Sequence, residues 1–260
     1  MAKVQQTGPT PVGKASGFNI ANKAAKRRLI VSVEGTQKSG KDHFALTAPG
    51  DIYVHDFDFG LDGVIQKFQD KKKIFVAEYK LDIPAGTAIQ DAADTARPVW
   101  EKFQDNYYEG LKKGRTSVLD TATDSYEVLR MAEFGKLQQV MPHHYTPVNQ
   151  AMKSMFRAAS DTDSNLIVLN RMKEEWINKV VNGKEKGEKT GNWIMAGYSG
   201  TYFEVQVCTR AYKEDGQFKL LIFDCRFNPD LEGMVLEGDM LNFPMLGQLV
   251  FPDSSEEDWQ

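Results

Sequence analysis

The chain has 260 residues, a formal net charge of −4 and a hydrophobic content of 41%. These values fit one α/β domain with short appendages. No apolar run approaches the length of a membrane-spanning helix, and the first residues lack the continuous apolar segment of a signal peptide, so we expect a cytoplasmic protein. Cys208 and Cys225 form no CxxC pair and have no nearby histidine, which favours reduced, buried thiols.

The charges are distributed unevenly. Six basic residues and no acid lie between Met1 and Arg28, whereas eight acids and no Lys or Arg follow Arg226. Residues 1–27 are rich in Gly, Pro, Ala, Gln and Lys without apolar periodicity, which predicts a flexible basic arm before a core over 28–251 and an acidic tail over 252–260. The basic end indicates a polyanion partner. The acidic end indicates either a basic partner or a tail that covers basic surface of the same protein. Two solvated tails are the alternative.

The first motif begins with the apolar run Leu29-Ile-Val-Ser-Val33, followed by Gly35-Thr-Gln-Lys-Ser-Gly-Lys41 and a helical segment through Leu46. This order of strand, loop and helix is that of a phosphate-binding P-loop. Its glycines let backbone N–H groups point inward, the helix adds its positive N-terminus, and the lysine reaches the β- and γ-phosphates. We therefore predict a triphosphate site formed by Gly35, Thr36, Gln37, Lys38, Ser39, Gly40, Lys41, Asp42 and His43.

One position departs from the motif. Asp42 follows the lysine, where a Ser or Thr hydroxyl would ligate Mg²⁺. A carboxylate here lies close to phosphate oxygens of the same sign, yet it suits a hard cation, so we expect Asp42 to bind the metal directly. The alternatives are a degenerate loop that binds nucleotide weakly and a Gly-rich turn that binds nothing.

The second expected strand covers residues 51–56, and Asp56, Asp58 and Asp62 lie at or beyond its end. Ligands of a doubly wound sheet bind at the edge where parallel strands finish, so these acids should approach the same crevice as Lys41. At a nucleotide site, Asp58 is the candidate base that orients or deprotonates the attacking water. The alternative is that Asp56 and Asp58 cap the next helix.

The middle of the chain alternates between strands and helices. We expect a strand at 74–79, one or two amphipathic helices over 85–113, and a strand over Ser117-Val-Leu119 that ends in Asp120. A strand-ending acid downstream of a P-loop indicates the carboxylate that holds Mg²⁺, and Asp120 is our choice for that role. Helices are expected at 126–139 and 148–159, with His143 and His144 in the loop between them.

A fourth apolar strand, Asn165-Leu-Ile-Val-Leu169, ends in Asn170 and Arg171. Asn170 is a candidate donor to the γ-phosphate or the water, and Arg171 a candidate sensor of the γ-phosphate. Residues 173–192 read as a mobile loop for contacts with a nucleic-acid backbone, with a solvated hairpin as the alternative. Two strands at 201–210 and 218–226 are joined by the hairpin signal Glu214-Asp-Gly216. The lysines expected to contact DNA are Lys179, Lys184, Lys186 and Lys189.

Taken in order, these motifs resemble the RecA-like recombinase core. They resemble more closely the phage-encoded RecA-like P-loop ATPases related to the single-strand annealing (Sak-type) recombinases, through the Gly40-Lys-Asp-His-Phe-Ala-Leu-Thr-Ala-Pro49 run, the Asn228-Pro-Asp-Leu-Glu-Gly233 segment and the Asp258-Trp259 ending. The resemblance covers residues 29–259. It implies a RecA-like α/β fold and an ATP- and Mg²⁺-dependent protein that binds single-stranded DNA and assembles into homo-oligomeric rings or filaments in the host cell.

The resemblance also implies roles for particular residues. Asp58 lies where the family has its catalytic glutamate, and Arg171 lies where it has a γ-phosphate-sensing glutamine. Arg226 lies near a basic pair that reaches the neighbouring subunit's nucleotide, although Asp224 departs from that pair. The tail ending in Trp259 resembles the acidic tips by which single-strand-binding proteins recruit partners.

The departure at Asp42 leaves two classes of function open. One is an ATPase, and the other is a nucleotide-dependent assembly or switch subunit with little hydrolysis. A P-loop kinase is a third class, which the late hairpin and the lack of an Arg-rich lid disfavour.

Overall fold

The computed structural model describes residues 27–138, 140–181 and 184–259. Within these residues, nine strands form one sheet, in which β3, β2, β4, β5, β1, β7, β8 and β9 are neighbours in this order and β6 pairs with β5. Six neighbouring strands, β3, β2, β4, β5, β1 and β7, run parallel to one another. The strands β6, β8 and β9 are antiparallel to their neighbours. The strands are β1 Ile30–Gly35, β2 Ile52–Asp56, β3 Ile74–Glu78, β4 Thr116–Asp120, β5 Asn165–Val181, β6 Lys184–Met195, β7 Val207–Glu214, β8 Gln217–Cys225 and β9 Val235–Glu237.

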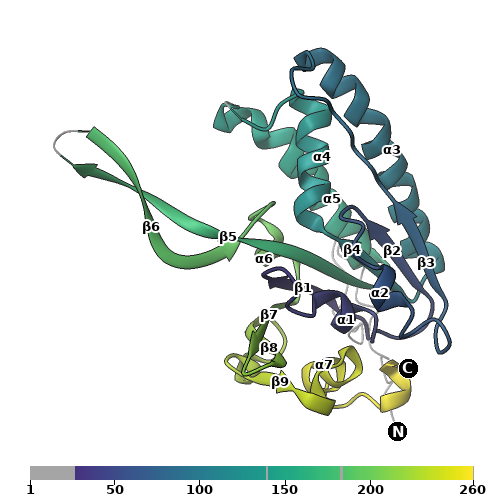
Figure 1. Cartoon of the computed structure of the whole chain (residues 1–260). Helices are drawn as coiled ribbons and strands as arrows, with labels where there is room; N and C mark the ends of the chain where they lie inside the picture. The colour runs from purple at the N-terminus through teal and green to yellow at the C-terminus, as the bar shows by residue number, and fades with distance from the viewer. Residues whose placement is uncertain (1–26, 139, 182–183, 260) are drawn as a thin grey trace, which may run out of the picture.

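Helices cover both faces of the sheet (Figure 1). The longer ones, α3, α4 and α5, pack on one face through side chains such as Phe103, Tyr107 and Met152, and α1 and α7 pack on the other through Phe44 and Phe243. The α-helices are α1 Lys41–Ala45, α2 Asp62–Ile65, α3 Ile89–Lys113, α4 Ala122–Phe134, α5 Tyr145–Asp161, α6 Thr201–Glu204 and α7 Phe243–Val250. Short 3-10 helices are η1 Pro142–His144, η2 Pro229–Leu231, η3 Gly238–Met240 and η4 Glu256–Trp259.

The central strands of the sheet are buried between the two layers of helices. Every residue of β1 and of β4 is buried, as expected for parallel strands that helices cover on both faces. The predicted fold class, an α/β protein with a mostly parallel sheet flanked by helices and a C-terminal hairpin, is confirmed. Among the described residues, no helix is long and apolar enough to cross a bilayer.

Residues 173–181 and 184–192 lie in the strands β5 and β6, which pair antiparallel and project from the body of the protein (Figure 1), so the prediction of a loop was wrong and the hairpin alternative is correct for the described residues. Contacts between side chains of β5 and β6 explain why these residues form paired strands. Lys179 Nζ lies 2.8 Å from Glu188 Oε2, and Lys189 Nζ lies 5.3 Å from the centre of the Trp176 ring. Such cross-strand pairs stabilise antiparallel ladders, and spacing along the sequence does not reveal them.

Two other boundaries differ from the prediction. The strand expected at 201–210 begins only at Val207, because residues Thr201–Glu204 form the short helix α6. The helix expected at 126–139 runs from Ala122 to Phe134 and ends at Gly135, whose φ of 62° is left-handed. A Cβ on Gly135 would lie 1.9 Å from the carbonyl oxygen of Ile89, so glycine is required there.

The β7–β8 hairpin was predicted correctly. Its turn contains Asp215 and Gly216, with φ values of 49° and 80°. Positive φ at both central residues is the geometry of a type I′ turn, which Asp-Gly favours and which matches the twist of the flanking strands.

The C-terminal residues pack against the core. Trp259 is fully buried, stacks on Phe251 with ring centres 5.8 Å apart, and approaches Gly247 so closely that a Cβ there would lie 2.4 Å from the indole. Asp258 pairs with Arg27, with 2.5 Å between Arg27 Nη1 and Asp258 Oδ2. Recruitment of a partner requires an exposed aromatic ring, so that role does not fit Trp259 as placed. The basic arm predicted for residues 1–27 lies outside the described residues except for Arg27.

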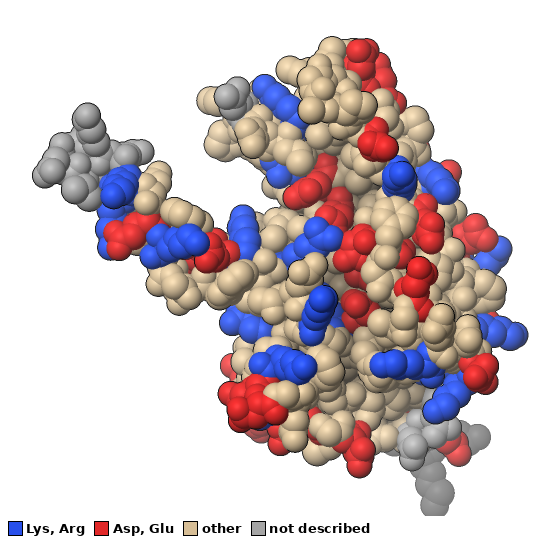
Figure 2. Space-filling view, viewed as in Figure 1, with Lys and Arg blue, Asp and Glu red and all other residues tan. Residues whose placement is uncertain are grey.

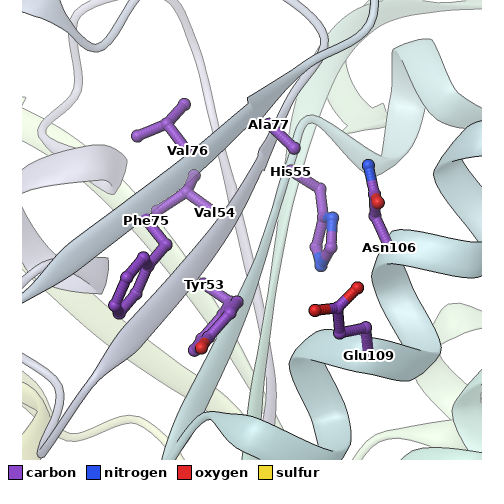
Figure 3. Close-up of a pocket in the computed structure, with 8 residues that line it drawn as sticks. All are labelled: Tyr53, Val54, His55, Phe75, Val76, Ala77, Asn106 and Glu109. Carbon is purple, nitrogen blue, oxygen red and sulfur yellow. The ribbon is translucent and has the colours of Figure 1, made fainter.

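A small pocket of about 170 Å³ lies between the strands β2 and β3 and the helix α3, lined by Tyr53, His55, Phe75 and Glu109 among others (Figure 3). The side chain of His55, which borders this pocket, is buried. Its Nδ1 lies 3.1 Å from the Tyr79 hydroxyl and its Nε2 lies 3.2 Å from Ser117 Oγ. Burial lowers the pKa of His55 to about 3. The imidazole is therefore neutral in the folded protein at physiological pH.

This burial predicts a loss of stability in acid. The unfolded chain protonates His55 near pH 6.5 but the folded protein does so only near 3, so the free energy of unfolding should fall by about 1.4 kcal/mol per pH unit between these values. The variant His55→Gln lacks this contribution. Urea unfolding from pH 7 to 4.5 should show the two proteins converging in stability as the pH falls, and parallel pH profiles would contradict the prediction.

Candidate nucleotide site

Four neighbouring parallel strands bring their carboxyl ends to one edge of the sheet. Asp56 at the end of β2 is opposite Asp120 at the end of β4. On the other side of β5, Gly35 of β1 is opposite Arg171. The predicted convergence of the P-loop with the strand ends at residues 56–58, 120 and 170 is therefore confirmed.

A pocket of about 720 Å³ opens at this edge. Its volume lies within the range of about 300–1,000 Å³ that is usual for small-molecule and cofactor sites. It is lined by Gly35, Thr36, Gln37, Lys38, Lys41, Asp42, Asp58, Gly60, Thr121, Arg171, Met172 and Trp193. The pocket is therefore open to a ligand at the place where the sequence predicted one.

The loop between β1 and α1 has the backbone of an anion-binding turn. Lys38 and Gly40 have left-handed φ values of 59° and 88°. A Cβ on Gly35 would lie 2.4 Å from Ser39 Oγ and 2.7 Å from the Ala211 carbonyl oxygen, so only glycine fits. Ser39 Oγ donates a hydrogen bond to the Thr36 carbonyl oxygen at 2.9 Å, which holds the loop closed on itself.

Lys41 lies at the bottom of this loop and is 7% exposed. Its Nζ donates hydrogen bonds to the carbonyl oxygens of Gly35 at 3.2 Å and Thr36 at 3.0 Å. Burial lowers the pKa of Lys41, and the nearby carboxylates of Asp42 and Asp120 partly oppose that shift. A buried ammonium held only by neutral carbonyls would gain from an anion bound in the loop.

Asp120 is the most deeply buried acid of the site, at 1% exposed. Burial and the neighbouring carboxylates raise its pKa to about 9, and neither of its carboxylate oxygens has a hydrogen-bond partner among the described residues. Burial also raises the pKa of Asp42. These oxygens are the hard donors that Mg²⁺ prefers, so the residues present fit a metal at this place.

Asp56 and Asp58 differ in their surroundings. Asp56 Oδ1 accepts hydrogen bonds from the backbone N–H groups of Asp58 at 3.0 Å and Phe59 at 2.8 Å, and burial raises the pKa of Asp56 to about 6. Asp58 lines the pocket with a quarter of its side chain exposed. The N-cap of α2 is Leu61 without a side-chain cap, so the alternative that these acids cap the next helix is wrong.

Arg171 also lines the pocket. Its Nη2 lies 2.9 Å from Asp124 Oδ2 and 3.4 Å from Asp58 Oδ2, and its backbone N–H donates to Thr123 Oγ1 at 3.0 Å. Sequence reasoning gave Asp124 no role. Its only signal was the Thr121-Ala-Thr-Asp124 order, in which Thr121 caps α4 by accepting from the Asp124 N–H.

Five predicted ligands do not line the pocket: Ser39, Gly40, His43, Asp120 and Asn170. Asn170 is 1% exposed, and its amide nitrogen donates to the Val168 carbonyl oxygen at 3.3 Å. Ser39 is buried within the loop. His43 is exposed on α1 beside Phe68, with ring centres 5.0 Å apart.

Two lining residues come from the hairpin. Met172 and Trp193, at the base of β5 and β6, lie at the pocket wall, and Trp193 is 45% exposed. The sequence could not indicate them, because the pairing of β5 with β6 is what brings residue 193 to the site. The outer ends of the same strands carry Lys179, Lys186 and Lys189, all exposed, whereas the side chain of Lys184 lies outside what the structure describes.

Arg226 lies apart from the pocket lining. It is exposed, and its Nη2 donates to the Phe203 carbonyl oxygen at 2.7 Å. The neighbouring Phe203 side chain is 80% exposed. The predicted contact of Arg226 with another subunit remains a prediction.

In the sheet, β5 lies between the P-loop strand β1 and β4, the strand that ends in Asp120, so the fold is an α/β fold with a phosphate loop at the carboxyl edge of its parallel strands. No protein-family model matches the chain, and no curated protein matches it. Among solved structures, it is similar to the RadB recombinase, with a TM-score of 0.44 and 12% identity over 80% of this chain and 86% of that chain. It is also similar to an ATPase from the type III secretion system of pathogenic bacteria, with a TM-score of 0.39 and 10% identity over 71% of this chain and 52% of that chain.

Proposed function

We propose that the protein is a P-loop ATPase that binds and hydrolyses ATP and acts on single-stranded DNA in recombination, annealing or replication. One observation carries the proposal: a P-loop with a buried lysine lines an open pocket of about 720 Å³, and the buried, unpartnered Asp120 directly precedes Thr121 of the same lining. A triphosphate would give the Lys41 ammonium an anionic hydrogen-bond acceptor in place of the loop carbonyls, and the unpartnered oxygens of Asp120 would be available to hold Mg²⁺.

Each side chain then has a task in hydrolysis. The loop N–H groups and Lys41 would bind the β- and γ-phosphates. Asp42 and Asp120 would hold Mg²⁺, which when bound neutralises charge on the phosphate oxygens. Asp58, partly exposed at the pocket, would orient the attacking water and accept its proton.

Arg171 connects the nucleotide pocket to the hairpin. It pairs with Asp58 and Asp124, and it belongs to β5, which continues directly into the hairpin. A γ-phosphate would compete with these carboxylates for the guanidinium. Its arrival would free Asp58 for water and shift the base of the hairpin, and this links ATP to DNA contact.

The hairpin offers a surface for single-stranded DNA. Lys179 is directly opposite Lys186 in the strand register, and Trp176 next to Lys189 is 58% exposed. Exposed lysines bind phosphates and exposed aromatic rings stack on bases. Figure 2 shows basic and acidic side chains together along this projection, so DNA phosphates must compete with glutamates such as Glu188 for the lysines.

That competition predicts opposite effects for neighbouring substitutions. The double variant Lys179→Ala, Lys186→Ala should bind single-stranded DNA more weakly, with the salt slope reduced by roughly 0.7 per lysine. Glu188→Gln should bind more tightly, because it releases Lys179. Fluorescence anisotropy with an oligonucleotide at several salt concentrations measures both, with Lys113→Ala as the control away from the hairpin. Equal affinities in all four proteins would contradict DNA binding by the hairpin.

A measurement of ATP turnover distinguishes an ATPase from an assembly or switch subunit with little hydrolysis. An ATPase should release phosphate from ATP, and single-stranded DNA should accelerate that release. The alternative, a nucleotide-dependent assembly or switch subunit, is favoured by Asp42, whose carboxylate lies at the place of the usual hydroxyl. Phosphate release by the unmutated protein, with and without DNA and beside Asp42→Thr, tests this. Stimulated turnover excludes the switch, whereas ATP binding without turnover supports it.

We further propose that the protein is phage-encoded, related to the Sak-type recombinases, and assembles as a homo-oligomer in the host cell. The exposed Arg226 next to the largely exposed Phe203 supports a subunit contact. Light scattering after gel filtration, with and without ATP, should show an assembly that Arg226→Ala weakens. A monomer under all conditions would contradict this part of the proposal.

A further inference from the structure

Three carboxylates at the pocket edge lie close enough to share one ion. Asp56, Asp58 and Asp120 each place an oxygen within 4.8 Å of the others. Oxygens that coordinate the same divalent cation at 2.0–2.6 Å lie no more than about 5 Å apart. The spacing of these three side chains therefore matches a common coordination sphere.

The burial of Asp120 is an independent observation that points to a missing partner. The residue is 1% exposed, and neither Oδ1 nor Oδ2 has a hydrogen-bond partner among the described residues. Leaving a buried carboxylate unpaired is unfavourable, and native structures normally satisfy such groups with a donor or a cation. Its oxygens face Asp56 and Asp58, which are themselves acceptors.

The free lone pairs of the other two acids fit the same centre. Asp56 uses Oδ1 for the backbone N–H groups of Asp58 and Phe59, so Oδ2 is left for an ion. Asp58 accepts from the Gly60 N–H through Oδ1. Its Oδ2 has only a 3.4 Å contact with Arg171, whose side chain is half exposed and held more closely by Asp124 at 2.9 Å.

The local charge favours a cation as well. Asp42, Asp56, Asp58, Asp120 and Asp124 surround the pocket edge, and the basic side chains against them are Lys41 and Arg171. Lys41 donates its hydrogen bonds to the loop carbonyl oxygens. Arg171 forms ion pairs with Asp124 and Asp58. Neither reaches the oxygens of Asp120.

We propose that Asp56, Asp58 and Asp120 bind a divalent cation in the protein without nucleotide. This site differs from the magnesium that arrives with ATP between Asp42 and Asp120, because the protein alone supplies three of its ligands. It does not depend on hydrolysis. It gives Asp58 a ligand role in the resting protein, and arrival of a γ-phosphate would then change the partners of Asp58 and Arg171 together.

Titration of the nucleotide-free protein with Mn²⁺, followed by the electron paramagnetic resonance of the free ion, tests the site. The expected result is saturable binding of one ion per chain. Asp56→Asn and Asp120→Asn should each weaken it by at least about tenfold. Asp62→Asn, an acid outside the cluster on α2, should bind as the unmutated protein does. Lys41→Ala should bind the ion at least as tightly as the unmutated protein, because it removes a positive charge close to Asp120.

Absence of saturable Mn²⁺ binding to the unmutated protein would overturn the inference, as would unchanged binding in both Asp56→Asn and Asp58→Asn. Asp58 is partly exposed, so its variant keeps the test valid if Asp120→Asn does not fold, which circular dichroism shows. The outcomes separate the two proposals. A protein that binds Mn²⁺ but not ATP contradicts the proposed function alone, and one that retains Mn²⁺ only with ATP contradicts this inference alone.

Discussion

Replacing Lys41 with alanine is expected to lower ATP hydrolysis by about a hundredfold to a thousandfold, the usual effect of removing one preorganised electrostatic contact to a reacting group. The lysine is the one P-loop side chain that the structure buries next to both the loop carbonyls and the acids of the site. Without its charge, the loop N–H groups must bind the phosphates alone. A phosphate-release assay at saturating ATP, with and without single-stranded DNA, measures the loss.

Two further variants show whether the loss is specific. Lys67→Ala removes an exposed lysine outside the pocket lining and should leave turnover unchanged. Far-ultraviolet circular dichroism of Lys41→Ala should match that of the unmutated protein, which shows that the variant is folded when its turnover is measured. Normal turnover in Lys41→Ala would show that the P-loop does not serve catalysis.

Replacing Trp259 with alanine is expected to destabilise the fold by about 3–5 kcal/mol, the range for deleting a buried tryptophan or phenylalanine side chain. Trp259 is fully buried, and it contacts α7 at Gly247 and stacks on Phe251. Its Nε1 also donates to Ser254 Oγ at 2.8 Å. Urea unfolding followed by far-ultraviolet circular dichroism measures the change.

The matched control is Trp176→Ala on the hairpin. That side chain is 58% exposed, so its loss should change stability by no more than about 0.5 kcal/mol. If both tryptophan variants unfold at the same urea concentration as the unmutated protein, the C-terminal residues are a free tail and the partner-recruiting role predicted from the sequence becomes open again.

The sequence predicts the centre of this fold well, because local chemistry determines it. The buried strand β1 is largely apolar, β4 contains the apolar pair Val118-Leu119 before Asp120, and Asp215-Gly216 is a turn signal in its own right. Gly35 and Gly40 have spacing that only a phosphate loop commonly requires. At these places local preference and tertiary structure agree.

The parts that sequence reasoning missed depend on contacts between distant residues. The β5–β6 hairpin is held by cross-strand pairs within a segment whose Gly, Lys and Glu content is also typical of loops. Trp259 is buried because α7 leaves a space over Gly247, and nothing in an acidic, hydrophilic end indicates that space.

In the candidate site too, residues that follow a predicted strand were expected, and residues placed by contacts between distant segments were not. Lys41, Asp58, Asp120 and Arg171 were all expected at one sheet edge, because each follows a strand of the predicted order. Asp124 and Trp193 were not expected to take part, since Asp124 becomes relevant only through its 2.9 Å contact with Arg171 and Trp193 only through the hairpin register. Asn170 was expected at the pocket, but its side chain turns into the buried interior.

The central claim is that the strand ends form a triphosphate site, and calorimetric titration of ATP into the protein in the presence of Mg²⁺ tests it most directly. The account predicts saturable binding of one ATP per chain that Lys41→Ala weakens strongly and Lys67→Ala does not change. Absence of binding, or equal affinity in the unmutated protein and Lys41→Ala, would contradict it.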